Sequence, residues 1–99
     1  MIVIRVNTNV KPDKRSEFLA AVQEEIPDSR AFAGCVSYVW SENIQKPNEF
    51  ALYEEWETLD NLNAYKNSAH FDQMGKILFP LLTEHPESSY YEAALLENA

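Results

Sequence analysis

The first ten residues alternate between two kinds of side chain. Every second residue from Ile2 to Val10 is aliphatic or a threonine, whereas the positions between them turn polar toward Asn9. Because the side chains of a strand point alternately to its two faces, this pattern predicts a β-strand with one aliphatic face. Pro12 then stops the strand, since proline has no N–H to donate, and it suits the first turn of a helix.

Apolar residues recur next at helical spacing. Phe18, Val22 and Ile26 follow one another by about one helical turn, which predicts an amphipathic helix that runs to Pro27. Pro27 removes a helix hydrogen bond and crowds the preceding turn, so we expect it to kink or break the helix. Residues 28–33 are expected to add one further turn.

The middle of the chain alternates between strand-forming and turn-forming segments. Residues 35–41 are rich in Val, Tyr and Trp and predict a second strand. Residues 42–49 contain Asn and Pro, which are typical of a hairpin turn. Residues 50–56 are again apolar and aromatic, and they predict a third strand that follows this turn.

Two helices and a last strand complete the pattern. Thr58 can cap a short helix, and Asn67 or Ser68 can cap the next one, which carries an apolar stripe. Pro80 lies inside that stripe and is expected to bend the helix or to end it early. Residues 88–96 predict the final strand.

The order of elements, β-α-β-β-α-α-β, has no internal linker or repeat and predicts one domain over residues 1–99. It is the order of the ferredoxin-like split βαβ arrangement, an α+β fold with a four-stranded antiparallel sheet and helices on one face. We expect large residues such as Tyr38, Trp40 and Trp56 on the bare face. Such a patch has to be covered, so we expect a homodimer whose facing sheets enclose a pocket.

Composition and charge narrow the classes of partner. With 45% hydrophobic and 12% aromatic residues, the chain is expected to fold rather than to remain disordered. A formal charge of −8 argues against nucleic acid, because affinity for phosphates depends on Lys and Arg. Without a basic amphipathic segment or a long apolar one, no membrane partner is expected. Cys35 is the single cysteine, so we expect no intrachain disulfide and a cytoplasmic location.

Several kinds of site can be set aside from residue types. Two glycines are too few for a Walker loop or a dinucleotide-binding loop. His70 and His85 lack the spacing of a zinc site, so we expect no metal and no bound cofactor. Cys35 has no histidine near it in the sequence and is expected to be a core residue rather than a nucleophile.

Two titratable side chains are candidates for chemistry. His70 falls in the first turn of a predicted helix, whose partial positive charge disfavours the imidazolium. A neutral imidazole there can accept a proton, or it can simply help to cap the helix. Glu54 shares its strand face with apolar residues, so it has to meet a partner, a ligand or solvent. Arg5 or Arg30 would make Glu54 part of a structural ion pair.

Several segments resemble a known family. One segment is a predicted apolar strand that ends with a carboxylate and a tryptophan, residues 50–56 (Phe-Ala-Leu-Tyr-Glu-Glu-Trp). Another is the start of a predicted helix, residues 67–71 (Asn-Ser-Ala-His-Phe). The turn at residues 10–14 and the join at residues 29–35 match in the same order. Together they resemble the antibiotic-biosynthesis monooxygenase (ABM) domain, a branch of the dimeric α+β barrel proteins.

The resemblance implies cofactor-independent oxygenation of a small electron-rich aromatic, such as a quinol or a polyketide-like phenol, in a pocket on the sheet face. It implies that His70 acts as the base, with Asn7 and Tyr65 orienting oxygen atoms. Tyr65 stands where many members carry a histidine. Glu54 and Arg30 are further candidates for substrate binding. The aromatic candidates for substrate binding are Tyr38, Trp40, Trp56 and Phe71.

Two other functions remain open. Residues 9–18 resemble the opening of the branch that processes autoinducer-2, which implies an isomerase or degradative enzyme for a small signal molecule. The second alternative is a non-enzymatic binder of small ligands on the same scaffold. Haem degradation is disfavoured, because Met-Gly-Lys at residues 74–76 stands in the region where that branch places a haem-ligating histidine.

Overall fold

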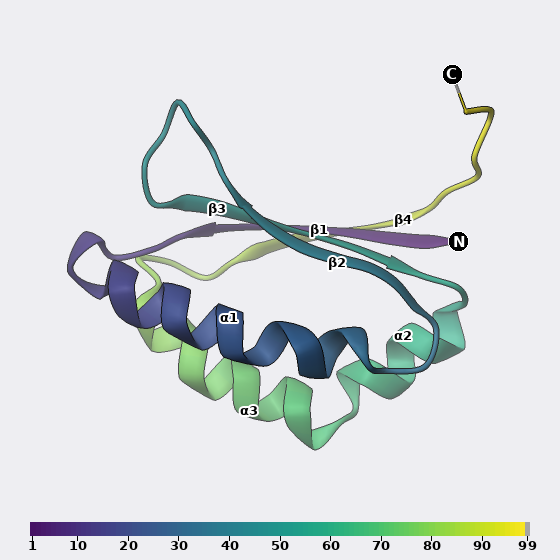
Figure 1. Ribbon diagram of the computed structural model, residues 1–99, viewed down its shortest axis with the longest axis horizontal. Helices are drawn as coiled ribbons and strands as arrows, with labels where there is room; N and C mark the ends of the chain where they lie inside the picture. Colours follow the sequence, from purple (N-terminus) through teal and green to yellow (C-terminus); the bar gives the residue numbers. More distant parts are fainter. Residues whose placement is uncertain (99) are drawn as a thin grey trace.

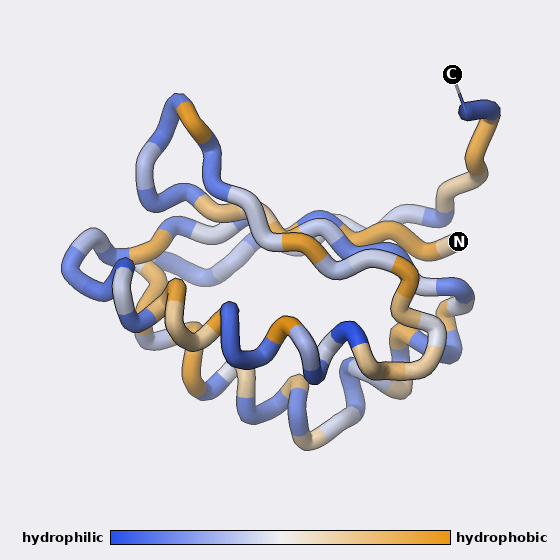
Figure 2. Tube along the Cα trace, viewed as in Figure 1, coloured by the Kyte–Doolittle hydropathy of each residue, from blue (hydrophilic) through white to orange (hydrophobic). Residues whose placement is uncertain are grey.

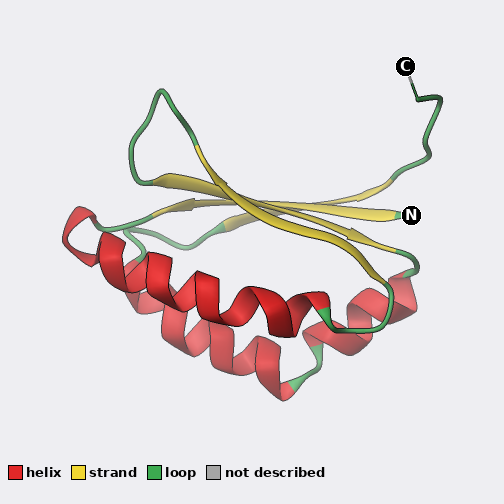
Figure 3. Cartoon of the chain, viewed as in Figure 1, coloured by secondary structure: helices red, strands yellow, loops and turns green. Residues whose placement is uncertain are grey.

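The computed structural model describes residues 1–98 of the chain. They form a four-stranded antiparallel sheet that is covered on one face by three α-helices (Figure 1, Figure 3). The strands lie in the order β2-β3-β1-β4, so the first strand is central. This is the ferredoxin-like α+β fold that the sequence predicts. The elements are β1 (Ile2–Asn9), η1 (Pro12–Lys14), α1 (Arg15–Arg30), β2 (Cys35–Glu42), β3 (Glu49–Trp56), α2 (Leu59–Lys66), α3 (Ala69–Leu78), η2 (Phe79–Leu81) and β4 (Glu87–Glu92).

The register of the sheet aligns one row of side chains across its helix-covered face. Ile4 of β1 lies opposite Glu54 of β3 and Tyr90 of β4. Tyr38 of β2 lies on the other side of Glu54. Residues directly opposite each other in antiparallel strands share a face. The aliphatic face of β1 therefore carries the Glu54 carboxyl group beside it, beneath the helices.

The large aromatic residues of β2 and β3 lie under the helices, so the expectation that they occupy the bare face was wrong. Tyr38 and Trp56 are buried, and Trp40 packs against the core. Trp40 lies opposite Leu52 in the register. The face that a residue shows is set by strand pairing, and a shift of one residue would exchange the two faces. Alternation along the sequence groups residues that share a face, but it does not say which of the two faces the helices cover.

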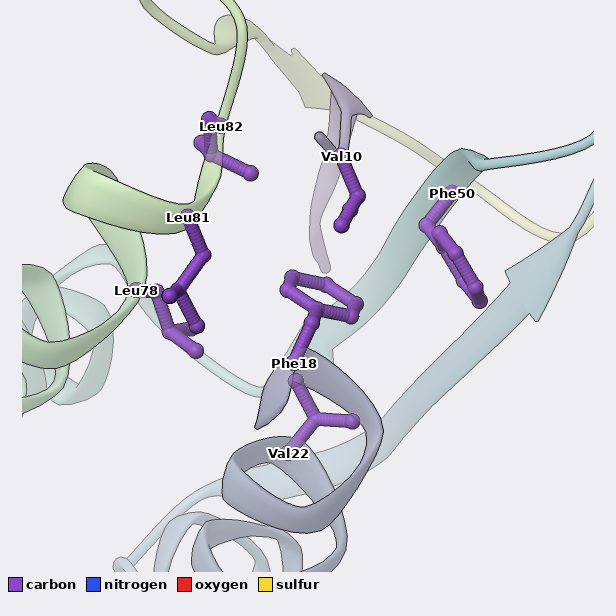
Figure 4. Packing of buried hydrophobic residues seen from close by; sticks show 7 residues of the cluster. All are labelled: Val10, Phe18, Val22, Phe50, Leu78, Leu81 and Leu82. Atoms are coloured by element: carbon purple, nitrogen blue, oxygen red, sulfur yellow. The ribbon is translucent and has the colours of Figure 1, made fainter. Parts of the chain in front are cut away.

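Two clusters of buried apolar side chains fill the space between the helices and the sheet. Figure 4 shows the Phe18 ring of α1 lying between Leu81 and Phe50 and below Val10. Trp40 packs against both clusters. Burial of each large apolar side chain stabilises the fold by about 1.5–3 kcal/mol. The first cluster is Val10, Phe18, Val22, Phe50, Leu78, Leu81 and Leu82; the second is Ile4, Tyr38, Leu52, Trp56, Leu62 and Tyr65.

Helix α1 continues through Pro27 to Arg30, so the predicted break at Pro27 does not occur. Pro27 lies in the last turn, where its missing N–H costs a single intrahelical bond. Side-chain hydrogen bonds hold this turn as well. Arg30 donates to the carbonyl oxygen of Tyr38 at 2.8 and 3.0 Å, and Ser29 donates to Glu25 at 2.6 Å.

Side-chain caps start the two later helices. The hydroxyl oxygens of Thr58 and Ser68 accept hydrogen bonds from backbone N–H groups three residues on, as the sequence predicts, with Ser68 rather than Asn67 as the second cap. Helix α3 ends at Leu78, just before Pro80, and continues as the short η2. Among the helices of residues 1–98, none has both the length and the apolar composition needed to cross a membrane.

The last strand is shorter than predicted, since β4 ends at Glu92 rather than at residue 96. Glu92 pairs with Ile2 in β1, and the final bond of this ladder joins the N–H of Ala93 to the carbonyl of Met1. Residues 93–98 leave the sheet, as Figure 1 shows, and they carry the apolar stretch near the C-terminus in Figure 2.

Candidate functional site

A cavity of about 130 Å³ lies between the sheet and the helices. Its floor is the aliphatic face of β1 with Leu52 and Glu54 of β3, and its walls come from α2 and α3. We expected a pocket on the bare face of the sheet, enclosed by two copies of the chain; this cavity lies on the covered face. The reason is the register, which turns the large side chains and Glu54 toward the helices.

Part of the cavity lining is exposed to solvent near the edge strand β4. Lys66 and Tyr90 both line it and are both exposed. The Lys66 ammonium lies 4.7 Å from the centroid of the Tyr90 ring, a distance suited to a cation–π contact. Lys66 and Tyr90 are thus exposed members of the lining, whereas Leu52 and Glu54 are buried members.

Glu54 provides a buried carboxyl group in this cavity. The residue is 5% exposed and accepts a hydrogen bond from the indole N–H of Trp56 at 2.9 Å. Burial raises the pKa of Glu54 to about 7, while the Trp56 hydrogen bond and the charge of Lys66 oppose that rise. The predicted ion pair with Arg5 or Arg30 does not form in the part of the chain that the structure describes.

Tyr65 contributes a phenol to the cavity wall. It is buried against Trp56, whose ring centroid lies 4.8 Å away. Burial raises the pKa of Tyr65 to about 12, although its hydrogen bond to Ser29 lowers it. The hydroxyl group therefore stays protonated at neutral pH. Glu54 and Tyr65 are thus a titratable carboxyl and a neutral phenol that line one cavity.

Behind Tyr65, a hydrogen-bond network connects three helices. The hydroxyl oxygen of Ser29 lies 2.6 Å from Glu25 Oε2, 2.9 Å from the Tyr65 hydroxyl and 2.9 Å from His70 Nε2. The Ser29 hydroxyl has one hydrogen to donate. An ionised Glu25 has no hydrogen on its carboxylate, so it can only accept. Ser29 therefore donates to Glu25, and both Tyr65 and His70 donate to Ser29.

Glu25 is the acceptor at the centre of that network. Its Oε1 atom accepts from the Tyr38 hydroxyl at 2.7 Å and from the Trp40 indole N–H at 3.3 Å. Burial raises the pKa of the Tyr38 hydroxyl far above its ordinary value, so it remains a donor. Each buried donor near Glu25 is thereby satisfied.

Sequence reasoning missed Glu25 and Ser29. The signal was present in α1, because Val22, Glu25 and Ser29 share the helix face that Phe18 begins. Polar residues on an otherwise apolar stripe indicate a buried hydrogen-bond network, since their burial is costly without partners.

The predicted site residues divide into those that line the cavity and those that do not. His70 stands behind Tyr65, with its side chain 22% exposed and its Nε2 atom 3.4 Å from Glu25. Asn7 is exposed on the bare face, and Arg30 holds the Tyr38 backbone. The predicted residues that line the cavity are Glu54, Tyr65, Trp40 and Phe71; those outside the lining are His70, Asn7, Arg30, Tyr38 and Trp56.

Metal-binding geometry is absent from the described part of the chain. No group of three His, Cys, Asp or Glu side chains within residues 1–98 lies close enough together to hold a metal ion. Cys35 is half-buried, and burial raises the pKa of its thiol, which disfavours the nucleophilic thiolate.

Comparison with known proteins places this geometry in a family. The chain is 33% identical over 93 residues to "Uncharacterized protein sll1783" from Synechocystis, which covers 94% of this chain and 63% of that protein. It is 35% identical over 71 residues to "Putative monooxygenase YcnE" from Bacillus subtilis, which covers 72% of this chain and 75% of that protein. The chain thus spans less than two thirds of the length of the Synechocystis relative.

A solved structure has the same fold. A conserved protein from Methanosarcina mazei superposes with a TM-score of 0.90 at 25% identity, over 94% of this chain and 92% of that one. The family model described as "Antibiotic biosynthesis monooxygenase" matches residues 1–76. The chain therefore belongs to the antibiotic biosynthesis monooxygenase family.

Proposed function

We propose that this protein is a cofactor-independent monooxygenase for a small electron-rich aromatic, such as a quinol or a phenol, bound in the cavity between sheet and helices. The observation that carries the proposal is Glu54, a carboxyl group with a pKa near 7 in an otherwise largely apolar cavity. A group with that pKa is a carboxylate in a large fraction of molecules at neutral pH, and it is a far stronger base than an ordinary glutamate.

The size and lining of the cavity support a single-ring ligand. An apolar cavity of roughly 150 Å³ is large enough to bind benzene, and this one measures about 130 Å³. Phe71, Trp40 and Leu62 supply flat or aliphatic walls. A substrate of several fused rings would need a larger cavity than this one.

In the proposed reaction, Glu54 as a carboxylate takes a proton from the bound substrate. The resulting electron-rich anion gives one electron to O₂, and the substrate radical and superoxide combine to form a C–O bond. Glu54 then returns its proton to the peroxide oxygen. Loss of water from this hydroperoxide leaves a carbonyl group, so one oxygen atom enters the product and the other leaves as water. The apolar walls exclude water that would quench the radical pair.

This assignment gives the role of base to Glu54 rather than to His70. The Nε2 atom of His70 is engaged by Ser29, and His70 does not line the cavity. A general base has to come within hydrogen-bonding reach of the proton that it removes. Glu54 and Tyr65 both line the cavity, so in this proposal Glu54 removes the proton and Tyr65 orients an oxygen atom of the ligand.

The test is oxygen uptake with a panel of anthrones and quinols, without added flavin or metal. We expect uptake by the wild type, incorporation of labelled O₂ into the product, and a large loss in Glu54→Gln. Glu57→Gln, an exposed carboxylate just beyond β3, is the matched control and should retain activity. Turnover of a hydroxylated ligand without O₂ would instead support the isomerase. Binding without turnover in any variant would support the non-enzymatic binder.

The bare face of the sheet supports a second proposal, a homodimer. Val39, Tyr53 and Tyr91 are exposed there, and the register places Val39 opposite Tyr53. Apolar surface of this kind on a regular sheet is well suited to a second sheet. Closed twofold symmetry is the commonest way for a soluble chain to cover such a face.

A further inference from the structure

Among the described residues that line the cavity, Lys66 is the one basic side chain. We propose that Lys66 selects substrates that carry a carboxylate on the aromatic ring, so that the substrate class is a hydroxylated aromatic carboxylate. The inference rests on the proposed function for the aromatic ring and its hydroxyl group. Lys66 acts here as a specificity-determining residue and takes no part in moving protons or electrons.

The register of the sheet relates Lys66 to the buried carboxyl group. Tyr90 of β4, Ile4 of β1 and Glu54 of β3 form one row across the helix-covered face, and all three line the cavity. The Lys66 ammonium lies 4.7 Å from the centroid of the Tyr90 ring, at the β4 end of this row. Burial raises the pKa of Glu54, and the charge of Lys66 opposes that rise. The charge of Lys66 therefore acts on the same cavity that Glu54 lines.

Lys66 lacks the anionic partner that several other basic side chains have. Lys14, Arg15, Lys46 and Lys76 each form an ion pair with a carboxylate. In the described part of the chain Lys66 forms none, although acidic residues outnumber basic ones by 16 to 8 in the sequence. Its contact with the Tyr90 ring provides no counterion. The ammonium is thus free to pair with an anionic group of a ligand.

The surroundings of Lys66 favour a ligand group with a single negative charge. Lys66 lies in the last turn of α2, where the helix dipole is negative and disfavours further anionic charge. A phosphate group carries close to two negative charges at neutral pH, and the described lining has no second basic side chain to balance them. One ammonium can balance a carboxylate. The apolar walls are left for the ring.

A lysine that only stabilises the end of α2 would make the same contacts, so the test needs a readout of ligand charge. The formal charge of the chain is −8, and a net negative charge disfavours anionic ligands in general. Without a cation that recognises the ligand, a neutral ligand should therefore bind at least as tightly as its anionic analogue. The proposal predicts the opposite preference.

The test compares gentisate, a quinol with a carboxylate on its ring, with gentisamide, in which a neutral amide replaces the carboxylate. Titration calorimetry at neutral pH measures both affinities. Lys66→Met removes the charge and keeps an unbranched side chain, whereas Lys66→Arg keeps the charge. Lys76→Met is the matched control, because it removes the same charge from an exposed lysine outside the cavity lining, which pairs with Asp72 at 3.0 Å.

We expect the wild type, Lys66→Arg and Lys76→Met to bind gentisate about tenfold more tightly than gentisamide, the order of magnitude for one hydrogen bond between charged groups. Lys66→Met should lose this preference and still bind gentisamide. Equal affinities in the wild type, or a preference that survives in Lys66→Met, would overturn the inference. An equal loss of the preference in Lys76→Met would assign it to net charge and would overturn the inference as well.

Oxygen uptake with the same two quinols separates this inference from the proposed function. A preference for gentisate without any oxygen uptake would overturn the proposed oxygenation and support the selectivity of Lys66. Uptake with the same kcat/KM for both quinols would support the oxygenation and overturn the selectivity. A wild type that binds neither quinol would overturn both.

Discussion

At the scale of single residues, the role proposed for Glu54 comes at a cost in stability. Its pKa is about 7 in the folded chain against an ordinary value of 4.5. The folded state therefore holds this proton more tightly than the unfolded state does. As pH rises from 4.5 through 7, the unfolded chain ionises first, and stability falls. A difference of about 2.5 units corresponds to about 3 kcal/mol lost above pH 7.

We therefore predict that Glu54→Gln stabilises the protein by up to about 3 kcal/mol at a pH well above 7 and changes little at a pH near 4. Glutamine keeps the shape and can still accept the Trp56 hydrogen bond, but it carries no charge to desolvate. Urea unfolding of wild type and variant at the two pH values measures the difference. Glu57→Gln serves as the exposed control, and equal destabilisation by Glu54→Gln at both pH values would contradict the prediction.

The same titration predicts the pH dependence of activity. Because the proposed base works as a carboxylate, the rate should fall by about tenfold per pH unit below the Glu54 pKa of about 7 and level off above it. The measurement is steady-state kcat/KM between pH 5 and pH 9, which should change by about tenfold per pH unit below the pKa. In Glu54→Gln the rate should drop roughly 10²–10⁴-fold and lose this inflection. An inflection that survives the substitution would assign the titration to another group.

At the scale of elements, the caps of the later helices hold the cavity wall in place. Phe71 and Met74 of helix α3 line the cavity. Ser68 caps the start of this helix, because its hydroxyl oxygen accepts a hydrogen bond from the N–H of Phe71 at 3.2 Å. The same hydroxyl donates to the carbonyl of Tyr65 at 2.6 Å. Ser68 thereby ties the end of α2 to the start of α3, and so fixes Tyr65 relative to Phe71.

We predict that Ser68→Ala lowers the free energy of unfolding by about 1 kcal/mol, the usual loss for a helix cap. Asn67→Ala, next to it and exposed, should change stability by less than about 0.5 kcal/mol. Thermal or urea unfolding of both variants tests this. If Asn67→Ala were the more damaging change, the assignment of the cap to Ser68 would be wrong.

At the scale of the whole molecule, the proposed homodimer depends on the bare face of the sheet. The helices cover one face, and Val39, Tyr53 and Tyr91 stand on the other. Light scattering at micromolar concentration should give a mass of about twice the 11.4 kDa of the chain. A mass that stays at the value of one chain would refute the proposed homodimer.

A charge placed in that face should separate the two copies. We predict that Val39→Glu shifts the chain to a monomer, because a carboxylate in a sheet interface is left without solvent or partner. Leu59→Glu is the matched control, since Leu59 is 55% exposed against 44% for Val39 and lies at the start of α2, away from the sheet. Sedimentation of both variants measures the effect, which should appear in Val39→Glu alone.

Local patterns in the sequence determined most of the elements of this protein. The alternation from Ile2, the caps at Thr58 and Ser68, and the stop before Pro80 each depend on a few neighbouring residues. Those signals are local because strand periodicity and helix capping are local. They were enough to predict the order of elements and the ferredoxin-like fold.

Tertiary structure alone decided which face of the sheet carries the candidate site. Strand pairing turned the aromatic residues and Glu54 under the helices. The network of Ser29, Tyr65 and His70 joins residues more than 35 positions apart. No short-range pattern encodes such contacts, because they depend on register and on helix packing across the whole sheet. The sequence supplied the carboxyl group and the phenol, and the fold brought them to one cavity.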